Sequence, residues 1–121
     1  MNEMRFVFTE LHTSDPEKAR AFYGKLLGWM YRDAAMPSGR YAFISVDGTT
    51  VGGITRTSRG ESSWLPYIGV ADLGAITARA TALGAAIEVD CQAFGGLGTL
   101  SVIRDPTGAT VGLWQEGRRS A

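Results

Sequence analysis

The sequence contains one cysteine and one histidine, and neither sign of charge is in excess. Cys91 cannot form a disulfide within the chain, and His12 cannot supply a site that needs two histidines from one protomer. Twelve basic residues balance twelve acidic ones, which argues against a nucleic acid or a membrane surface as partner. Because no long apolar run and no signal pattern is visible, we expect a cytoplasmic location.

The chain is long enough for one core and too short for two independent ones. It has 121 residues, of which 45% are hydrophobic. A chain of this size buries most of its apolar surface as one compact unit. We therefore expect a single domain over residues 1–121.

The first half of the chain predicts a strand, a helix and two further strands. The segment "RFVFTELHTSD" is rich in β-branched and aromatic residues, and Ser14 or Asp15 can cap a helix with Pro16 at its first position. Apolar residues recur at helical spacing from Glu17 to Leu27, and Gly28 follows as the expected left-handed cap. The segments "RYAFISVDG" and "TTVGGITR" predict two strands joined by an Asp-Gly turn.

The second half repeats this order. "WLPYIGVAD" predicts a strand, residues 73–83 a helix ended by Gly84, and "AAIEVD", "GTLSVIRD" and "ATVGLWQE" three more strands. The strongest internal match aligns "DGTTVGG" with "DPTGATVGL" and sets Gly52 against Gly112. We infer two modules, about 1–57 and 64–117, joined by a polar linker at about 57–63.

Three stretches carry a resemblance that spans nearly the whole chain: "TSDPEKARAFYGKLLGW", "YIGVADLGAITARATALGA" and "RDPTGATVGLWQ". They resemble landmarks of the glyoxalase/bleomycin-resistance (vicinal oxygen chelate) family, and "FTEL", "VGGI" and "GLWQ" look closest to its branch related to lactoylglutathione lyase. The resemblance implies an α+β fold in which two βαβββ modules form a curved mixed sheet around a cavity. It also implies a homodimer. It does not select one function, because the family includes isomerases, dioxygenases, thiol transferases and drug-binding proteins.

The resemblance also implies where a metal would be held. Family enzymes place His, Gln or Glu ligands in the first and last strands of each module. Here those positions fall at Phe8, Leu65 (or Pro66), Gly52 and Gly112, and none offers a ligand. We therefore expect neither a metal nor another cofactor.

Side chains alternate between the two faces of a strand, so the ligand positions predict which residues line the cavity. This alternation selects Phe6, Phe8, Glu10 and His12 from the first strand, Tyr67 and Trp114 from the second module, and Gly52, Ile54 and Arg56 from the first-half meander. Five of the candidate residues suit ligand binding: Phe6, Phe8, Arg56, Trp64 and Trp114. Such a lining suits an apolar or aromatic small molecule.

The polar residues of this lining are the candidate catalytic groups. Glu10 among aromatic rings would resist ionisation unless paired, which suits a general acid or base assisted by His12 or Tyr67. The alternative is structural, with Glu10 paired to Arg56 or another basic residue and His12 capping the strand end near Asp15. Trp29 is expected in the core, whereas Trp64 and Trp114 stay open between packing and stacking on a ligand.

Three hypotheses for function follow. The first is a metal-independent protein that binds or transforms an apolar or aromatic metabolite. The second is a lyase, isomerase or cyclase that uses Glu10. The third, a metal-dependent glyoxalase or dioxygenase, requires a different alignment of the ligand positions.

Overall fold

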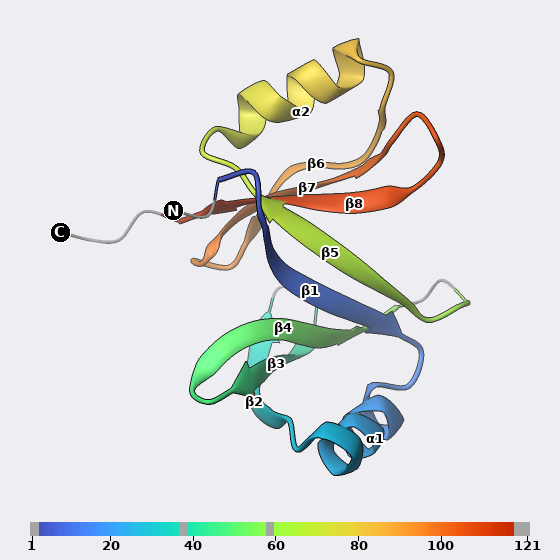
Figure 1. Ribbon diagram of the computed structural model, residues 1–121, viewed down its shortest axis with the longest axis vertical. Coiled ribbons are helices and arrows are strands. Elements are labelled where there is room, and N and C mark those ends of the chain that lie inside the picture. The colour runs from blue at the N-terminus through green and yellow to red at the C-terminus, as the bar shows by residue number, and fades with distance from the viewer. Residues whose placement is uncertain (1–2, 37–38, 58–59, 118–121) are drawn as a thin grey trace, which may run out of the picture. The chain divides into compact units, whose positions relative to one another are not determined.

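The computed structural model describes residues 3–36, 39–57 and 60–117. The chain divides into two compact units: a first unit, Phe8–Leu65, and a second unit made of Met1–Val7 together with Pro66–Ala121. In each, the chain runs strand, helix and then three strands (Figure 1). This order confirms the α+β class and the predicted pair of βαβββ modules.

The first unit has four strands in the order β2-β3-β4-β1. β1 and β4 are parallel, and the other neighbours are antiparallel. The elements are β1 (Phe6–Thr13, which enters the unit at Phe8), α1 (Pro16–Leu27), β2 (Met30–Met36), β3 (Gly39–Val46) and β4 (Thr49–Arg56).

The second unit repeats this pairing in the order β5-β8-β7-β6, with β5 and β8 parallel. Its elements are β5 (Ser63–Gly69, which enters the unit at Pro66), α2 (Leu73–Ala82), β6 (Ala86–Phe94), β7 (Gly98–Arg104) and β8 (Thr110–Glu116).

Side-chain and glycine caps set the helix ends. Asp15 rather than Ser14 caps α1, since its Oδ1 accepts a hydrogen bond from the Lys18 N–H at 3.0 Å, and Gly28 ends the helix with φ 72°. Asp72 caps α2 in the same way. Within the described ranges, neither helix has the length and apolar character needed to cross a membrane.

One strand of the first unit, β2, was not predicted from the sequence. β2 pairs along its length with β3 and lies at the end of the strand order of the first unit, although no strand was predicted over its residues. Its sequence, MYRDAAM, has two charges and no β-branched residue, a composition that edge strands tolerate. β6 is also longer than predicted, so Cys91 lies within it and not after it.

Each helix packs on a small apolar core on one side of its sheet. In the first unit the buried residues are Leu11, Ala42, Ile44 and Ile54, with Ala19, Tyr23, Trp29 and Tyr31 packed against them. In the second unit they are Val70, Leu73 and Leu113, with Ile68, Ile76 and Ile103 around them. The core position predicted for Trp29 is confirmed.

A β-bulge in β4 reverses the side-chain faces predicted for that strand. Ile44 pairs with Gly52 but Ser45 pairs with Thr50, so Val51 is an extra residue. Ile54 consequently packs in the α1-side core, and the prediction that it faces the cavity is wrong. The same correction applies to Arg56, whose Nη1 donates to the Ser14 carbonyl at 2.6 Å.

Candidate functional site

A row of paired residues crosses the first sheet. Arg32 pairs with Phe43, Phe43 with Gly53, and Gly53 with Glu10. Residues paired in this way point to the same face. Because the next residues after Glu10 and Gly53 belong to the α1-side core, this row lies on the opposite face of the sheet.

Gly53 makes room for a tyrosine ring within this row. A Cβ atom on Gly53 would lie 2.0 Å from Tyr41 Oη and 2.3 Å from two carbons of the ring. The ring therefore lies over the glycine and reaches β1, where Tyr41 Oη donates a hydrogen bond to Glu10 Oε2 at 2.6 Å. Tyr41 and Glu10 are 2% and 5% exposed. Glu10 is thus a buried carboxylate with a phenol bound to one oxygen.

The other oxygen of Glu10 meets the imidazole of His12. His12 Nε2 lies 2.6 Å from Glu10 Oε1, yet it has no aligned hydrogen-bond partner among the described residues. The contact is therefore electrostatic, and the attraction is greatest when the imidazole is protonated. The His12 side chain is 32% exposed and that of Glu10 only 6%, so His12 is the member of the pair that solvent reaches.

Aromatic rings extend this arrangement toward the edge strand. The ring centroids of Phe43 and Tyr41 are 4.7 Å apart, and Arg32 Cζ lies 4.7 Å from the centroid of the Phe43 ring. We call Glu10, His12, Tyr41, Phe43 and Arg32 the Glu10 cluster. It combines an apolar surface with a carboxylate, an imidazole and a guanidinium.

The structure brings Glu10 and His12 together, and of the basic residues considered as structural partners of Glu10 it is His12, not Arg56, that contacts the carboxylate. Its partners are Tyr41 and His12, whereas Arg56 binds the Ser14 carbonyl on the α1 side. His12 accordingly contacts Glu10 and does not serve only as a cap at the strand end. Phe8 shares the face of Glu10 by strand alternation and is half-buried.

Trp64 belongs to an aromatic group beside α1. Its ring meets Tyr23 and Trp29 edge to face, at centroid distances of 5.6 and 6.1 Å. Tyr23 and Trp29 pack on the α1-side core. Trp64 is 40% exposed and is separate from the Glu10 cluster within the first unit.

The remaining candidates lie in the second unit. Tyr67 is buried, and a Cβ atom on Gly112 would lie 2.2 Å from its ring, so a tyrosine again covers a glycine. Trp114 packs edge to face on Phe94 with centroids 6.0 Å apart. Phe6 is 69% exposed.

The two covered glycines bear on metal binding. Gly53 pairs with Glu10 and Gly112 with Tyr67, so both occupy the same position in their modules, one residue away from the predicted Gly52 in the first. A carboxylate side chain at either position would overlap a tyrosine ring. Among the described residues, no group of three His, Cys, Asp or Glu side chains could hold a metal ion.

The chain is similar in sequence to one family model and to several known proteins. Residues 5–47 match the family model described as bleomycin resistance protein-like N-terminal. CFP32 of Mycobacterium bovis, a protein whose name assigns it provisionally as a glyoxylase, is 34% identical over 92% of this chain. The anthracycline biosynthesis protein DauV of a Streptomyces species is 26% identical over 89% of the chain. The chain spans about half the length of these relatives, 45% and 46% respectively.

Solved structures share the fold at low sequence identity. Methylmalonyl-CoA epimerase from Mycobacterium tuberculosis superposes with a TM-score of 0.69 and 15% identity, over 93% of this chain and 88% of the epimerase chain. A variant of homoprotocatechuate 2,3-dioxygenase from Brevibacterium fuscum superposes with a TM-score of 0.72 and 18% sequence identity. The match covers 99% of this chain and 34% of the dioxygenase chain.

Proposed function

Because the chain belongs to the glyoxalase/bleomycin-resistance (vicinal oxygen chelate) superfamily, we propose that it binds a small apolar or aromatic molecule without a metal ion. The binding surface is the face of the first sheet that carries the Glu10 cluster. The single observation that carries the proposal is the Tyr41 ring over Gly53, since this buried ring fills the space that a metal-binding side chain would need.

The residues at this face do not fit a divalent ion. Such an ion needs several N, O or S donors that converge at fixed distances. Glu10 and His12 supply two donor groups, and Tyr41 donates its own hydrogen bond to the carboxylate. Space for a third ligand at Gly53 is taken by the ring, and the same holds for Gly112 under Tyr67.

The chemistry of the cluster favours a flat ligand with a polar group. The buried rings of Phe43 and Tyr41 form the apolar floor of this face, and the half-buried imidazole of His12 can donate or accept one hydrogen bond. Phe8 extends this surface along β1. The ligand contacts expected at Phe6, Tyr67 and Trp114 remain predictions, whereas Arg56 and Trp64 are not part of this surface.

A thermal-shift screen tests ligand binding. The probes are aromatic metabolites, glutathione adducts and antibiotics, since a ligand at 100 times its dissociation constant adds about 2.7 kcal/mol of stability. We expect at least one aromatic compound to stabilise the protein. His12→Asn should weaken the shift, and Arg79→Gln on the exposed side of α2 is the matched control. A panel in which no aromatic compound shifts the midpoint contradicts the proposal.

The Tyr41–Glu10–His12 contacts favour a second candidate function, an acid–base lyase, isomerase or cyclase. In this reaction Glu10, held by Tyr41, orients the imidazole, and His12 exchanges a proton with the ligand. An epimerase is among the proteins of the same fold. With a ligand from the screen that is converted, Glu10→Gln should abolish turnover and preserve binding, and retained turnover excludes this role.

The homodimer implied by the family resemblance is part of the proposal. Family modules complete their sheets across a two-fold interface. Sedimentation equilibrium should therefore show a dimer at micromolar concentration. A monomer throughout that range contradicts this part.

A further inference from the structure

A groove of about 800 Å³ opens on the α1 side of the first unit, on the other face of the sheet from the Glu10 cluster. Its walls are the first turns of α1 and parts of β2, β3 and β4. Three arginines from three different elements line it: Arg20 of α1, Arg40 of β3 and Arg56 of β4. No role assigned above uses this groove.

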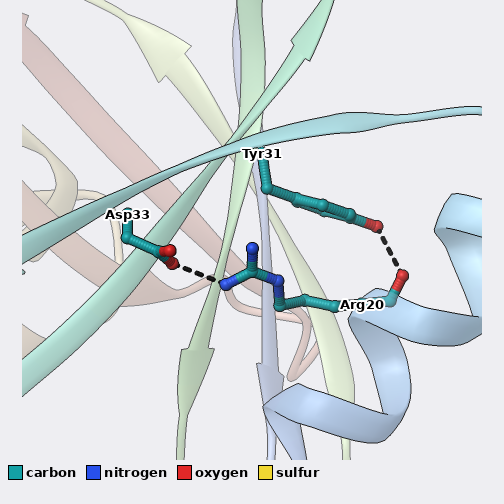
Figure 2. A network of polar contacts seen from close by, with 3 residues as sticks. All are labelled: Arg20, Tyr31 and Asp33. Atoms are coloured by element: carbon teal, nitrogen blue, oxygen red, sulfur yellow. Dashed lines mark hydrogen bonds and ion pairs between the residues drawn. The ribbon is translucent and has the colours of Figure 1, made fainter.

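Arg20 is held in place by its neighbours, as Figure 2 shows. Its Nη1 lies 2.5 Å from Asp33 Oδ1, and its Cζ lies 4.9 Å from the centre of the Tyr31 ring. Tyr31 Oη in turn donates to the Arg20 carbonyl oxygen at 3.1 Å. Burial raises the pKa of Tyr31, opposed by the charge of Arg20 and assisted by Tyr23, so the phenol keeps the proton that it donates. A guanidinium fixed in this way loses little freedom when a ligand binds.

The other two arginines leave the groove with surplus positive charge. Arg56 is anchored by its hydrogen bond to the Ser14 carbonyl, and Arg40 lies at the exposed start of β3. Two carboxylates also line the groove: Asp33, which is paired with Arg20, and Glu17 in the first turn of α1. Three guanidinium groups against two carboxylates leave one unbalanced positive charge at neutral pH.

We propose that this groove is a second binding site, for a small organic anion with one carboxylate or phosphate group. Arginine suits both groups because its planar fork can donate two parallel hydrogen bonds. The anionic group would lie between Arg40 and Arg56, within reach of Arg20. The apolar part of the ligand would rest on the Tyr31 ring and on Ala21, which line the same groove.

A purely structural role explains why Arg20 lies in the groove, but it does not explain why all three arginines line it. The Arg20–Asp33 pair, with Asp33 largely exposed, is a surface salt bridge and is complete without further cations. It does not require two more arginines around the same hollow. The three arginines lie outside the Glu10 cluster, although Tyr41 of that cluster also lines the groove, so the site can be tested separately from the proposed function.

An amide NMR titration at constant ionic strength tests the site. The probes are benzoate and phenyl phosphate, with neutral benzamide as the matched control ligand. We expect saturable shifts at the amides of residues 20, 40 and 56 with at least one anion and none with benzamide. Arg40→Gln and Arg56→Gln should each weaken binding about tenfold, the loss expected for one charge-assisted hydrogen bond. Arg79→Gln, far along the chain on α2, should leave the affinity unchanged.

The two anions distinguish a carboxylate ligand from a phosphate ester. Saturation by benzoate alone assigns a carboxylate ligand, and saturation by phenyl phosphate assigns a phosphate ester. The proposal is overturned if neither anion saturates these amides, if benzamide shifts them equally, or if both variants bind like Arg79→Gln. The amide spectrum of each variant reports at the same time whether its fold is intact.

Discussion

The substitution Gly53→Ala probes the contact on which the Glu10 cluster is built. The added methyl group would lie 2.0 Å from Tyr41 Oη and 2.3 Å from two ring carbons, well inside van der Waals contact. Tyr41 cannot simply swing away, because it is 2% exposed and its hydroxyl is bound to Glu10. Either the ring moves and the hydrogen bond is lost, or the backbone of β4 shifts.

The expected cost follows from three contributions. Overfilling a packed site costs about 1–3 kcal/mol. Loss of a hydrogen bond to a buried carboxylate costs about 1.5–3 kcal/mol. Replacing glycine by alanine within a strand returns about 0.5–1 kcal/mol, because the unfolded chain is less flexible. We therefore expect Gly53→Ala to lower the free energy of unfolding by about 1.5–5.5 kcal/mol, a large share of the ~5–15 kcal/mol typical of a domain.

Urea denaturation of four variants separates this explanation from a general intolerance of the site. Gly96→Ala is the control, since nothing lies within 4 Å of its Cβ position. In a Tyr41→Val background the ring is absent, so adding Gly53→Ala should cost almost nothing. An equal cost with and without the Tyr41 ring, or a loss below about 0.5 kcal/mol in the native background, would refute the reasoning.

Three further outcomes are expected. Gly112→Ala should destabilise the protein by a similar amount in urea denaturation, because a buried tyrosine ring lies 2.2 Å from the new methyl group, and a neutral result contradicts this. Ser101→Ala should cost about 1–3 kcal/mol in the same assay, because Ser101 Oγ is the acceptor for the Cys91 N–H. Hydrogen bonds from the Thr107 hydroxyl, and then from backbone N–H groups, hold the pKa of Asp105 below its usual 3.8. The ionised carboxylate therefore stabilises the folded state above that pH, and this stabilisation is lost as the pH falls through the lower pKa of the folded state. Asp105→Asn should therefore flatten the acid limb of stability against pH, and an unchanged limb would argue against it.

The helix ends and most strands could be predicted because their signals are local. Asp15, Pro16 and Gly28 satisfy the ends of α1 with no help from distant residues. The strand β2 gave no such signal, because its formation depends on pairing with β3 and not on its own sequence.

The face of β4 could not be predicted because the sequence repeat conceals a bulge. Aligning the two Thr-Val-Gly segments sets Gly52 against Gly112, yet the extra residue Val51 makes Gly53 the structural equivalent. A shift of one residue moves every later side chain of the strand to the other face. This is why Arg56 was assigned to the wrong side.

Tyr41 was missed as the partner of Glu10. It lies in an apolar run of β3, and its hydroxyl reaches across β4 to β1, a contact that no local pattern encodes. The usable signal was the Gly52-Gly53 pair, since glycine inside a strand marks a place where another group approaches closely.

Metal titration of the purified protein tests the central claim most directly. Isothermal calorimetry with manganese, iron(II), nickel and zinc, followed by elemental analysis after dialysis, measures both affinity and content. The covered glycines predict no stoichiometric binding and a metal content far below one ion per chain. One tightly bound ion per chain, lost in the Glu10→Gln variant, would contradict the metal-free account and place a metal at the Glu10 cluster.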